Sequence, residues 1–403
     1  MKRLKSVLLG AVALAAVAAA PAVAQTNVKI GVLSDMSSLY TDLAGAGSVL
    51  AARMAADDFG AAAKGLRVEF VSADHQNKAD VGSNIARQWY DRDGVDMIVD
   101  VPNSGVALAV NGVTREKNKV FLVSGAATSA LTGEQCSPNT VHWTYDTWAL
   151  ANGTGKAIVQ TGGDTWFFLT ADYAFGHQLE ADTSNVVKSL GGRVLGGVRA
   201  PLNTNDFSSF LLQAQSSRAK IIGLANAGGD TVNSIKQAAE FGIVKRGQSL
   251  AGLLVFITDV HGLGLDTAQG LIMTEAFYWD QNDASRAFAK RFAAANKGIH
   301  PTMVHAGVYA STLHYLKAIE ATKSAADGKA VVEKMKATPT DDPLFGKGEI
   351  RKDGRKIHDM YLYEVKQPSE SKGAWDYYKT RATIPAAQAF RPLAEGKCPL
   401  VGG

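Results

Sequence analysis

The stretch that decides the fold is Val95-Asp96-Met97-Ile98-Val99-Asp100-Val101-Pro102-Asn103-Ser104-Gly105. Its first half is a short run rich in apolar and β-branched residues, which is typical of a buried strand. The proline and small polar residues that follow open a helix in which Val106, Val110 and Val113 recur at helical spacing. A strand that leads directly into a helix is the repeating unit of α/β proteins with parallel sheets.

The same unit recurs on both sides of this stretch. Apolar runs predict strands at residues 28–33, 66–71 and 119–123, with helical spacing at residues 43–54 and 81–89. Strands that alternate with single helices imply parallel pairing through right-handed crossovers. We therefore expect a parallel α/β lobe in the first third of the chain.

The pattern then restarts, which predicts a second α/β lobe. Further strands are expected at residues 165–170, 193–195, 219–224 and 250–257. Residues 142–147 are the first candidate crossing between the lobes.

The C-terminal part carries elements that the pattern alone assigns to neither lobe. A strand and two helices are predicted at residues 271–277, 288–292 and 309–316. We then expect a hairpin that pairs residues 348–351 with residues 360–365 around a turn at Asp353-Gly354.

The composition is that of an ordinary globular protein of two domains. The 403 residues are 46% hydrophobic and 20% charged, which excludes a disordered or fibrous chain. Lys and Arg number 42 against 38 Asp and Glu, for a net charge of +4. No strong charge field therefore indicates a nucleic-acid or membrane partner.

The N-terminus has the pattern of a cleavable secretory signal peptide at residues 1–24. Basic residues precede an apolar run at residues 7–20, and Ala22 and Ala24 form a small-x-small cleavage pattern before Gln25. An uncleaved anchor is the alternative, but the run is shorter than the roughly 20 residues that span a bilayer. The expected mature protein is exported, with a net charge of +1 because three basic and no acidic residues are removed.

Two cysteines, Cys136 and Cys398, remain in the mature chain, and an exported protein keeps disulfides. We predict one bridge that ties the C-terminal tail to the middle of the chain; two free thiols are the alternative.

The motifs of enzymes and cofactor sites are absent from the sequence. There is no G-x-S-x-G, Walker or H-E-x-x-H pattern, and Gly45-Ala46-Gly47 is followed by Leu50 where a dinucleotide fingerprint needs Gly or Ala. His300 and His305 are five residues apart, which does not align them as metal ligands on a helix. We therefore expect no enzyme activity, no cofactor and no metal.

Small polar residues follow two neighbouring strands, at residues 102–105 and 124–129. The carboxyl ends of parallel strands are where open α/β sheets bind ligands, and backbone N–H groups and hydroxyls there favour an anion. The alternative is that Ser104 and Thr128 only cap their own helices. Because the two segments coincide on adjacent strands, we favour a ligand site.

Several fragments in a fixed order carry a family resemblance. They are residues 30–37, 74–77, 94–104, 124–132, 171–176 and 345–355. With these fragments, residues 28–366 resemble the type I periplasmic substrate-binding proteins of ABC transporters, in particular the leucine/isoleucine/valine-binding branch.

The resemblance implies an α/β protein of two Rossmann-like lobes with parallel-rich sheets joined by three hinge crossings. The crossings are expected near residues 143–147, 277–281 and 340–347. The N-terminal lobe is expected at residues 25–145 plus 281–340, and the C-terminal lobe with the tail at residues 146–280 plus 341–403.

The resemblance also implies a function. A monomeric periplasmic protein would close on a small carboxylate, and an ABC transporter permease would recognise the closed form. A periplasmic sensor of the same fold, which presents its ligand to a receptor, is the alternative.

The site residues follow from the same resemblance. Ser104, the backbone of Ala126, and the hydroxyl and backbone of Thr128 match the positions that hold the ligand carboxylate, and Asn103 and Ala127 adjoin them. The other candidates are Phe175 and Asn226 or Ala227, which fall at or near positions where amino-acid binders have tyrosines, Asp259 as acceptor of a ligand ammonium, and Tyr40 and Tyr173 beside the cleft.

The departures from the family pattern bear on the ligand. Burial of an ammonium group needs an acceptor, and Phe175 and Asn226 replace tyrosine hydroxyls with other groups. An aromatic acid of the benzoate, phenylacetate or hydroxycinnamate kind is favoured, because further aromatic residues lie near cleft segments: Tyr40, Trp143, Tyr145, Trp148 and Tyr173. A branched-chain or other amino acid is the alternative.

Overall fold

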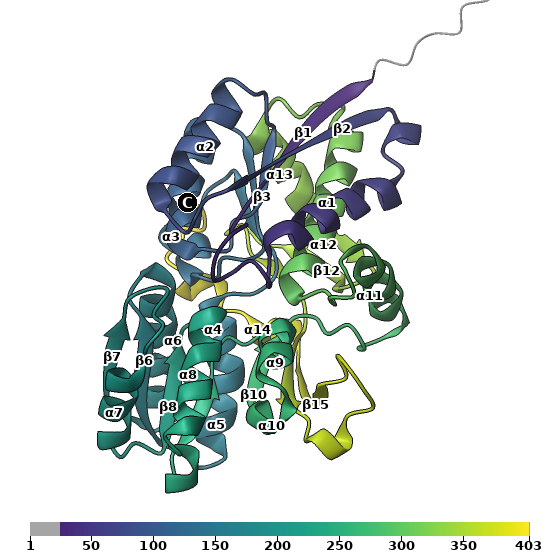
Figure 1. Ribbon diagram of the computed structural model, residues 1–403. Helices are drawn as coiled ribbons and strands as arrows, with labels where there is room; N and C mark the ends of the chain where they lie inside the picture. Colours follow the sequence, from purple (N-terminus) through teal and green to yellow (C-terminus); the bar gives the residue numbers. More distant parts are fainter. Residues whose placement is uncertain (1–24, 403) are drawn as a thin grey trace, which may run out of the picture.

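The computed structural model describes residues 25–402, which form two lobes stacked one above the other (Figure 1). The predicted signal peptide at residues 1–24 lies outside the described residues. Both lobes are α/β units built on parallel sheets, as predicted.

The first lobe is built on a five-stranded sheet in the order β2-β1-β3-β4-β5, with every pair parallel. Its strands are β1 (Thr26–Ser34), β2 (Leu66–Asp74), β3 (Met97–Asp100), β4 (Val120–Val123) and β5 (Thr140–His142). All four residues of β3 are buried, and they alternate between two cores. Met97 and Val99 pack with one layer of helices, and Ile98 packs with the other.

Helices cover both faces of this sheet (Figure 1). Helices α1 and α12 pack together on one face, and α2 and α3 on the other. The helices of this lobe are α1 (Gly45–Phe59), α2 (Ala79–Asp91), α3 (Ser104–Glu116), α11 (Asp283–Ala295), α12 (Met303–Thr322) and α13 (Gly328–Ala337), with the 3-10 turns η1 (Ala62–Lys64) and η2 (Ser129–Thr132).

The second lobe has a four-stranded parallel sheet in the order β7-β6-β8-β9. Its strands are β6 (Thr165–Ala171), β7 (Arg193–Ala200), β8 (Ile221–Ala225) and β9 (Ser249–Gly252). The expected strand at residues 250–257 is shorter than predicted, because the chain leaves the sheet after Gly252 and starts a helix at Ile257.

The helices of the second lobe flank this sheet. They are α4 (Thr147–Leu150), α5 (Lys156–Gln160), α6 (Ala174–Ser189), α7 (Ser208–Ser216), α8 (Gly229–Glu240), α9 (Ile257–Leu263) and α10 (Leu265–Ala268), with the π-helical turn η3 (Ala151–Gly155) and the 3-10 turn η4 (Val244–Arg246).

The predicted hairpin at residues 348–365 is wrong. Two small antiparallel sheets stand in its place: β11 (Thr340–Asp342), β12 (Gly346–Ile350) and β13 (Lys356–Ile357) form one, and β10 (Ile272–Glu275), β14 (Met360–Val365) and β15 (Tyr378–Ile384) form the other. The turn at Asp353-Gly354 does reverse the chain, but it pairs β12 with the two residues of β13. Strand β14 pairs instead with β10 and β15 of the second lobe.

The chain passes between the lobes after β5, after β10 and between β13 and β14. The third passage comes later than the expected residues 340–347. Strands β11 and β12 contact α12 and α13, and Arg355 bridges to His142 of β5, so residues 340–357 lie against the first lobe. The expected boundary at residue 341 differs, because no pattern in the sequence indicates that this short sheet packs on α12 and α13.

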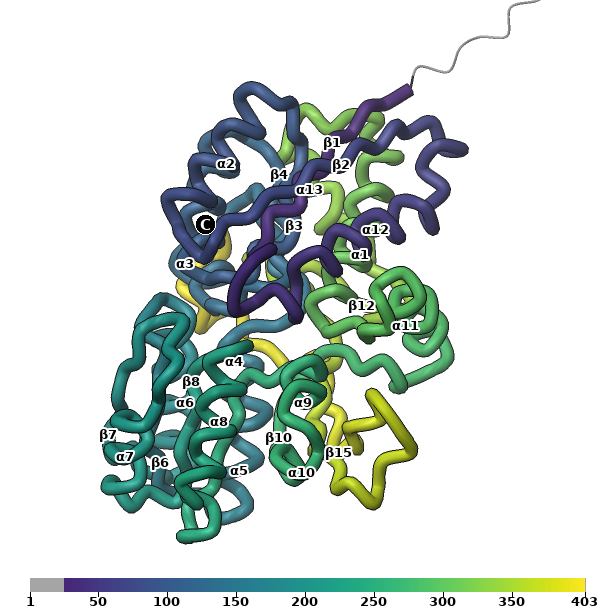
Figure 2. Tube along the Cα trace, viewed as in Figure 1, coloured from purple at the N-terminus to yellow at the C-terminus, as the bar shows by residue number. Residues whose placement is uncertain are grey.

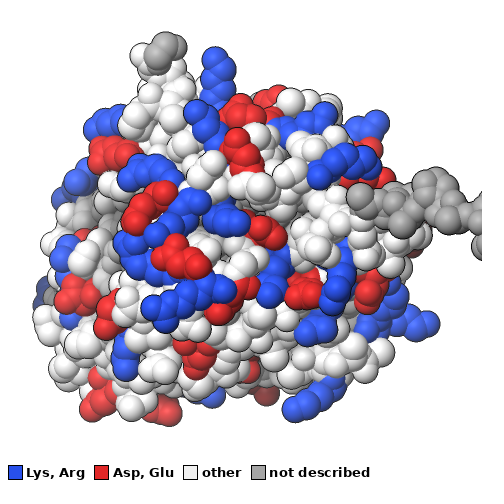
Figure 3. All heavy atoms as spheres, turned by 90° about the horizontal axis from the view of Figure 1, so that it is seen from above, with Lys and Arg blue, Asp and Glu red and all other residues white. Residues whose placement is uncertain are grey.

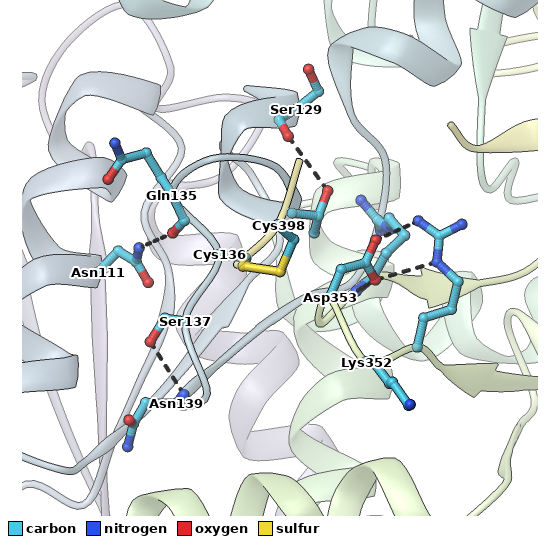
Figure 4. The surroundings of a disulfide bond; sticks show 12 residues. Asn111, Ser129, Gln135, Cys136, Ser137, Asn139, Lys352, Asp353 and Cys398 are labelled. Carbon is cyan, nitrogen blue, oxygen red and sulfur yellow. Dashed lines mark hydrogen bonds and ion pairs between the residues drawn. A yellow bond between two sulfur atoms is a disulfide. The ribbon is translucent and has the colours of Figure 1, made fainter. Parts of the chain in front are cut away.

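The tail makes a fourth passage, back to the first lobe (Figure 2), where Gly396 lies beside Thr132 of η2. Its short helices are α14 (Ala386–Ala389) and η6 (Leu393–Glu395), and η5 (Pro368–Glu370) precedes β15. The predicted disulfide between Cys136 and Cys398 is present and closes this passage (Figure 4).

The surface carries both signs of charge. Viewed from above the first lobe, Lys and Arg side chains alternate with Asp and Glu (Figure 3). Within residues 25–402, no helix combines the length and the apolar character that crossing a bilayer requires.

Candidate ligand-binding cleft

A small pocket lies between the two lobes. It is lined by Tyr40, Leu43, Pro102, Gly125 and Ala127 of the first lobe, Tyr145 of the first crossing, and Tyr173, Phe175, Ala227, Leu254 and Phe256 of the second lobe. Five of these side chains are aromatic and none is charged. The pocket therefore offers flat apolar surface with a few hydroxyl and backbone groups.

A strained turn at the end of β3 shapes the first-lobe side of the pocket. Asp100 and Val101 have φ values of 85° and 55°, in the left-handed region that a β-branched residue rarely adopts. The turn aims Pro102 at the pocket, and the side chain of Asn103 then accepts a hydrogen bond from the N–H of Val106 and caps α3.

Ser104 joins this turn to the loop after β4. Its Oγ accepts hydrogen bonds from the N–H groups of Ala127 and Thr128, at 3.3 and 3.2 Å. The carbonyl of Ala126 accepts a hydrogen bond from His142 Nε2 at 2.8 Å, and burial lowers the pKa of His142, which keeps its ring neutral. The two segments that the sequence predicted to adjoin are thus brought together, and we call residues 124–128 the cradle loop.

Thr128 also caps a helical turn, as the alternative interpretation predicted. Its Oγ1 accepts a hydrogen bond from the N–H of Ala130 and caps the turn η2, at 3.4 Å. A hydroxyl oxygen has a second lone pair and a proton of its own, so this cap leaves the Thr128 hydroxyl able to donate to an anion.

The second lobe contributes through the N-terminus of α6 and the loops after β8 and β9. Tyr173 is the residue before α6, and Phe175 lies in the first turn of that helix. Ala227 follows β8, and Phe256 precedes α9. These are the carboxyl ends of parallel strands, where ligand sites of α/β sheets form.

The lobes touch across the pocket, so the structure is a closed form. The hydroxyls of Tyr40 and Tyr173 are 2.5 Å apart, and the N–H of Gly229 donates to the carbonyl of Leu39 at 3.3 Å. A side chain at Gly228 would not fit, because a Cβ there would lie 2.5 Å from the Leu39 carbonyl oxygen. The small size of the pocket follows from this closure.

Six predicted candidates do not line the pocket: Asn103, Ser104, Ala126, Thr128, Asn226 and Asp259. The Asn226 side chain accepts a hydrogen bond from Thr231 Oγ1 and donates one to Ser234 Oγ, and the next residue, Ala227, lines the pocket instead. Asp259 accepts a hydrogen bond from the N–H of Phe256 at 2.9 Å, and burial raises the pKa of its carboxyl to about 7.

Three lining residues escaped the sequence analysis altogether: Leu43, Leu254 and Phe256. Phe256 lies in the run that was expected to be a strand, so the sequence did not predict that it belongs to a loop at the cleft. A strand predicted to end near Gly252 would have identified Phe256 as an aromatic residue that follows the carboxyl end of a strand. Pro102, Gly125 and Tyr145 lie in segments that the sequence placed near the cleft, but the family resemblance implied no role for them.

Comparison with known proteins identifies the family. The family model described as periplasmic binding protein matches residues 27–374. The chain belongs to this family. As a periplasmic binding protein, it binds a solute and does not convert it chemically.

The relatives agree with this assignment. The chain is similar to the crystal structure of a periplasmic binding protein from Burkholderia mallei, with 55% identity and a TM-score of 0.90 over 93% of this chain and 99% of that one. It is similar to a branched chain amino acid ABC transporter periplasmic ligand-binding protein from Burkholderia xenovorans LB400, with 42% identity and a TM-score of 0.82 over 93% and 100%. Leu/Ile/Val-binding protein homolog 6 of Brucella melitensis is 26% identical over 70% of this chain and 73% of that protein.

A more distant structure shares the fold. A solute-binding protein of an ABC transporter from R. palustris, solved in complex with benzoate, is 21% identical, with a TM-score of 0.79 over 89% of this chain and 97% of that one.

Proposed function

We propose that this periplasmic binding protein delivers a small aromatic carboxylate, of the benzoate class, to an ABC importer by closing its two lobes around it. The composition of the pocket lining carries the proposal. Tyr40, Tyr145, Tyr173, Phe175 and Phe256 supply aromatic surface, and no charged side chain lines the pocket. Such a pocket suits a ring whose one charge is a carboxylate.

Gly125 and Ala127 of the cradle loop line the pocket, and the carboxylate is proposed to bind at this loop. Ser104, Ala126 and Thr128 bring hydroxyl and N–H donors to the carboxyl ends of β3 and β4. Charge-assisted hydrogen bonds to a carboxylate are worth about 1.5–3 kcal/mol each. The cradle loop could therefore hold an anion without a lysine or arginine.

An amino acid is the second candidate, favoured by the relative described as a branched chain amino acid ABC transporter protein. Its ammonium group would need an acceptor. Asp259 is the acidic residue expected for this role, yet its carboxylate already accepts a hydrogen bond from the N–H of Phe256. Burying an ammonium without a partner costs several kcal/mol, which favours the aromatic acid.

A melting-temperature screen decides between the two ligand classes. The protein is unfolded and refolded to remove copurified ligand, and is then heated with benzoate, 4-hydroxybenzoate, phenylacetate, L-leucine or L-valine. A ligand that binds only the folded state stabilises it by RT ln(1 + [L]/Kd). We expect the aromatic acids to raise Tm and the amino acids to leave it unchanged; the reverse order would overturn the aromatic-acid assignment.

Two variants test the binding mode by titration calorimetry with benzoate. Ser104→Ala is expected to weaken binding by roughly tenfold to a hundredfold, because it removes a donor to the carboxylate. Asp259→Asn is the matched control and is expected to leave benzoate affinity within about twofold. A large loss for benzoate in Asp259→Asn would place this residue in the binding mechanism after all.

The alternative of a periplasmic sensor concerns the partner and not the ligand. Uptake of radiolabelled benzoate into cells that lack this protein separates the two roles. Uptake that falls in the deletion strain and returns with the wild-type protein supports transport. Unchanged uptake, with loss of a benzoate-induced transcriptional response, would favour the sensor.

A further inference from the structure

Ser129 is held from three directions by parts of the chain that are distant in sequence. It is the first residue of η2 and directly follows the cradle loop. Its N–H donates to Thr147 Oγ1 at 3.1 Å, its Oγ donates to Asp182 Oδ2 at 2.9 Å, and its carbonyl accepts from Arg391 Nη2 at 3.0 Å. Thr147 and Asp182 belong to α4 and α6 of the second lobe, and Arg391 belongs to the tail.

Asp182 is the centre of this network. It lies on α6, is buried, and accepts hydrogen bonds at Oδ2 from the hydroxyls of Ser129 and Thr147, the latter at 2.6 Å. Gln178 Nε2 donates to its Oδ1 at 3.0 Å. Burial raises the pKa of Asp182, and the hydrogen bonds from Thr147, Ser129 and Gln178 act in the opposite direction.

These three hydrogen-bond partners are neutral side chains. Burying a carboxylate costs free energy unless its oxygens accept hydrogen bonds. The hydroxyls of Ser129 and Thr147 can both reach the same oxygen of Asp182 only when η2, α4 and α6 keep one relative position. The carboxylate therefore fixes the position of η2 relative to α6.

Helix α6 connects this network to the pocket. Its N-terminus carries Tyr173 and Phe175, which line the pocket, and Asp182 lies two turns further along the same helix. Thr147 adds a second link, because its own N–H donates to the carbonyl of Ala127 in the cradle loop at 2.8 Å. One helix thus contacts the ligand cleft directly and the cradle loop through Ser129 and Thr147.

We propose that Asp182 is a positioning residue for ligand binding: from the second lobe it holds, through Ser129 and Thr147, the loop that receives the ligand carboxylate in the first lobe. The proposal rests on the proposed function for the identity of the ligand. It adds that the geometry of the anion site depends on the position of the second lobe.

A measurement without ligand tests the mechanical part. Hydrogen–deuterium exchange is followed in a peptide that covers residues 124–133, in the wild type, Asp182→Ala and Glu180→Ala. Glu180 is the matched control, since it lies on the same helix and accepts a hydrogen bond from Thr170 Oγ1 at 2.7 Å within the second lobe. We expect exchange in this peptide to be at least fivefold faster in Asp182→Ala and unchanged in Glu180→Ala. Equal exchange in both variants would overturn the proposal.

Ligand titration tests the functional part, with benzoate as the probe. Asp182→Ala is expected to weaken benzoate binding by about tenfold, and Asp182→Asn to restore most of the affinity, because an amide oxygen still accepts from both hydroxyls. Glu180→Ala should bind as the wild type does. An Asp182→Ala protein that binds benzoate with wild-type affinity would refute the coupling.

The two measurements separate this proposal from the proposed function. If the wild type binds none of the carboxylates, the function fails, while the exchange experiment still decides the role of Asp182. If Asp182→Ala does not fold, Ser129→Ala removes one hydroxyl of the network and leaves the carboxylate in place. Faster exchange of residues 124–133 in Ser129→Ala supports the proposal, and unchanged exchange contradicts it.

Discussion

Asp100 stands at the strained end of β3 and is buried without an ion-pair partner among the salt bridges of the described residues. Ser34 Oγ donates to its Oδ2 at 2.8 Å, yet burial still raises the pKa of the carboxyl to about 7. The folded chain therefore holds this proton at a pH where the unfolded chain has lost it. Its contribution to stability is greatest at low pH and declines as pH rises from about 4 to about 7.

Asp100→Asn is expected to remove this pH dependence. Asparagine mimics the protonated carboxyl and tolerates the left-handed φ of 85°. The quantity compared is the free energy of unfolding of the variant minus that of the wild type. This difference should rise between pH 4 and pH 7, by at most about 1.4 kcal/mol for each pH unit, and should be constant above pH 7. Urea unfolding at four pH values measures this difference. Parallel curves for the two proteins would show that Asp100 does not titrate in this range.

Individual site residues could be predicted only where the position of the backbone alone places the residue in the site. Ser104 and the cradle loop follow strands whose ends could be located from the apolar runs, so their proximity could be inferred. Asn226 and Asp259 lie close in sequence to residues that line the pocket, but the direction of each side chain depends on the hydrogen-bond partners that the folded chain brings to it. Asn226 bonds to Thr231 and Ser234 within α8, and Asp259 caps α9.

At the scale of elements, α12 lies against the sheet of the first lobe with a glycine at the contact. A Cβ at Gly307 would lie 1.9 Å from Thr144 Oγ1 and 2.4 Å from Ser124 Oγ. These hydroxyls hydrogen-bond to each other at 2.8 Å, and Ser124 Oγ also donates to the carbonyl of Val304 at 2.7 Å. The close approach of α12 depends on the missing side chain.

Gly307→Ala is therefore expected to destabilise the protein by about 1–3 kcal/mol, since the added methyl overpacks a buried contact. Gly112→Ala in α3 is the control, because nothing lies within 4 Å of a Cβ there. That substitution should stabilise by up to about 1 kcal/mol through helix propensity. Urea unfolding of both variants measures the difference, and equal effects would contradict the packing argument.

The elements themselves were predicted unevenly. Long apolar runs such as that of β1 gave strands close to their observed bounds. Strand β15 was missed, because six of its seven residues have exposed or half-exposed side chains and no apolar run marks it. The predicted partner of β14 was wrong for a different reason. The alternating pattern of β14 fits any antiparallel neighbour, and the chain crosses to the second lobe before β14, where β10 lies.

At the scale of the whole molecule, the disulfide and the tail hold the lobes together outside the three crossings. Arg391 donates to Ser129, Asn152 Nδ2 donates to the carbonyl of Gln388 at 2.8 Å, and the guanidinium of Arg355 lies 4.5 Å from the ring of Phe390. The tail therefore contacts both lobes, including Arg355, which comes shortly before the third crossing. The two cysteines were enough to predict that the tail returns to the middle of the chain. They could not predict which residues the tail contacts there.

Loss of the bridge is expected to destabilise the folded state. The two cysteines are 262 residues apart, and the chain-entropy model gives at most about 5 kcal/mol for so long a loop. The double variant Cys136→Ala/Cys398→Ala should therefore unfold at a lower urea concentration than the oxidised wild type. Adding reductant should shift the wild type toward the variant and leave the variant unchanged. A wild type that is insensitive to reductant would show that the bridge contributes nothing.

The bridge has a further consequence for a molecule under tension. Every residue of the second lobe lies between Cys136 and Cys398, within the ring that the bond closes. If the described chain is stretched from its two ends in an optical trap, force passes across the sulfur atoms and bypasses that lobe. Only the segment that precedes Cys136 and the few residues that follow Cys398 can lengthen, until a reducing agent releases the rest.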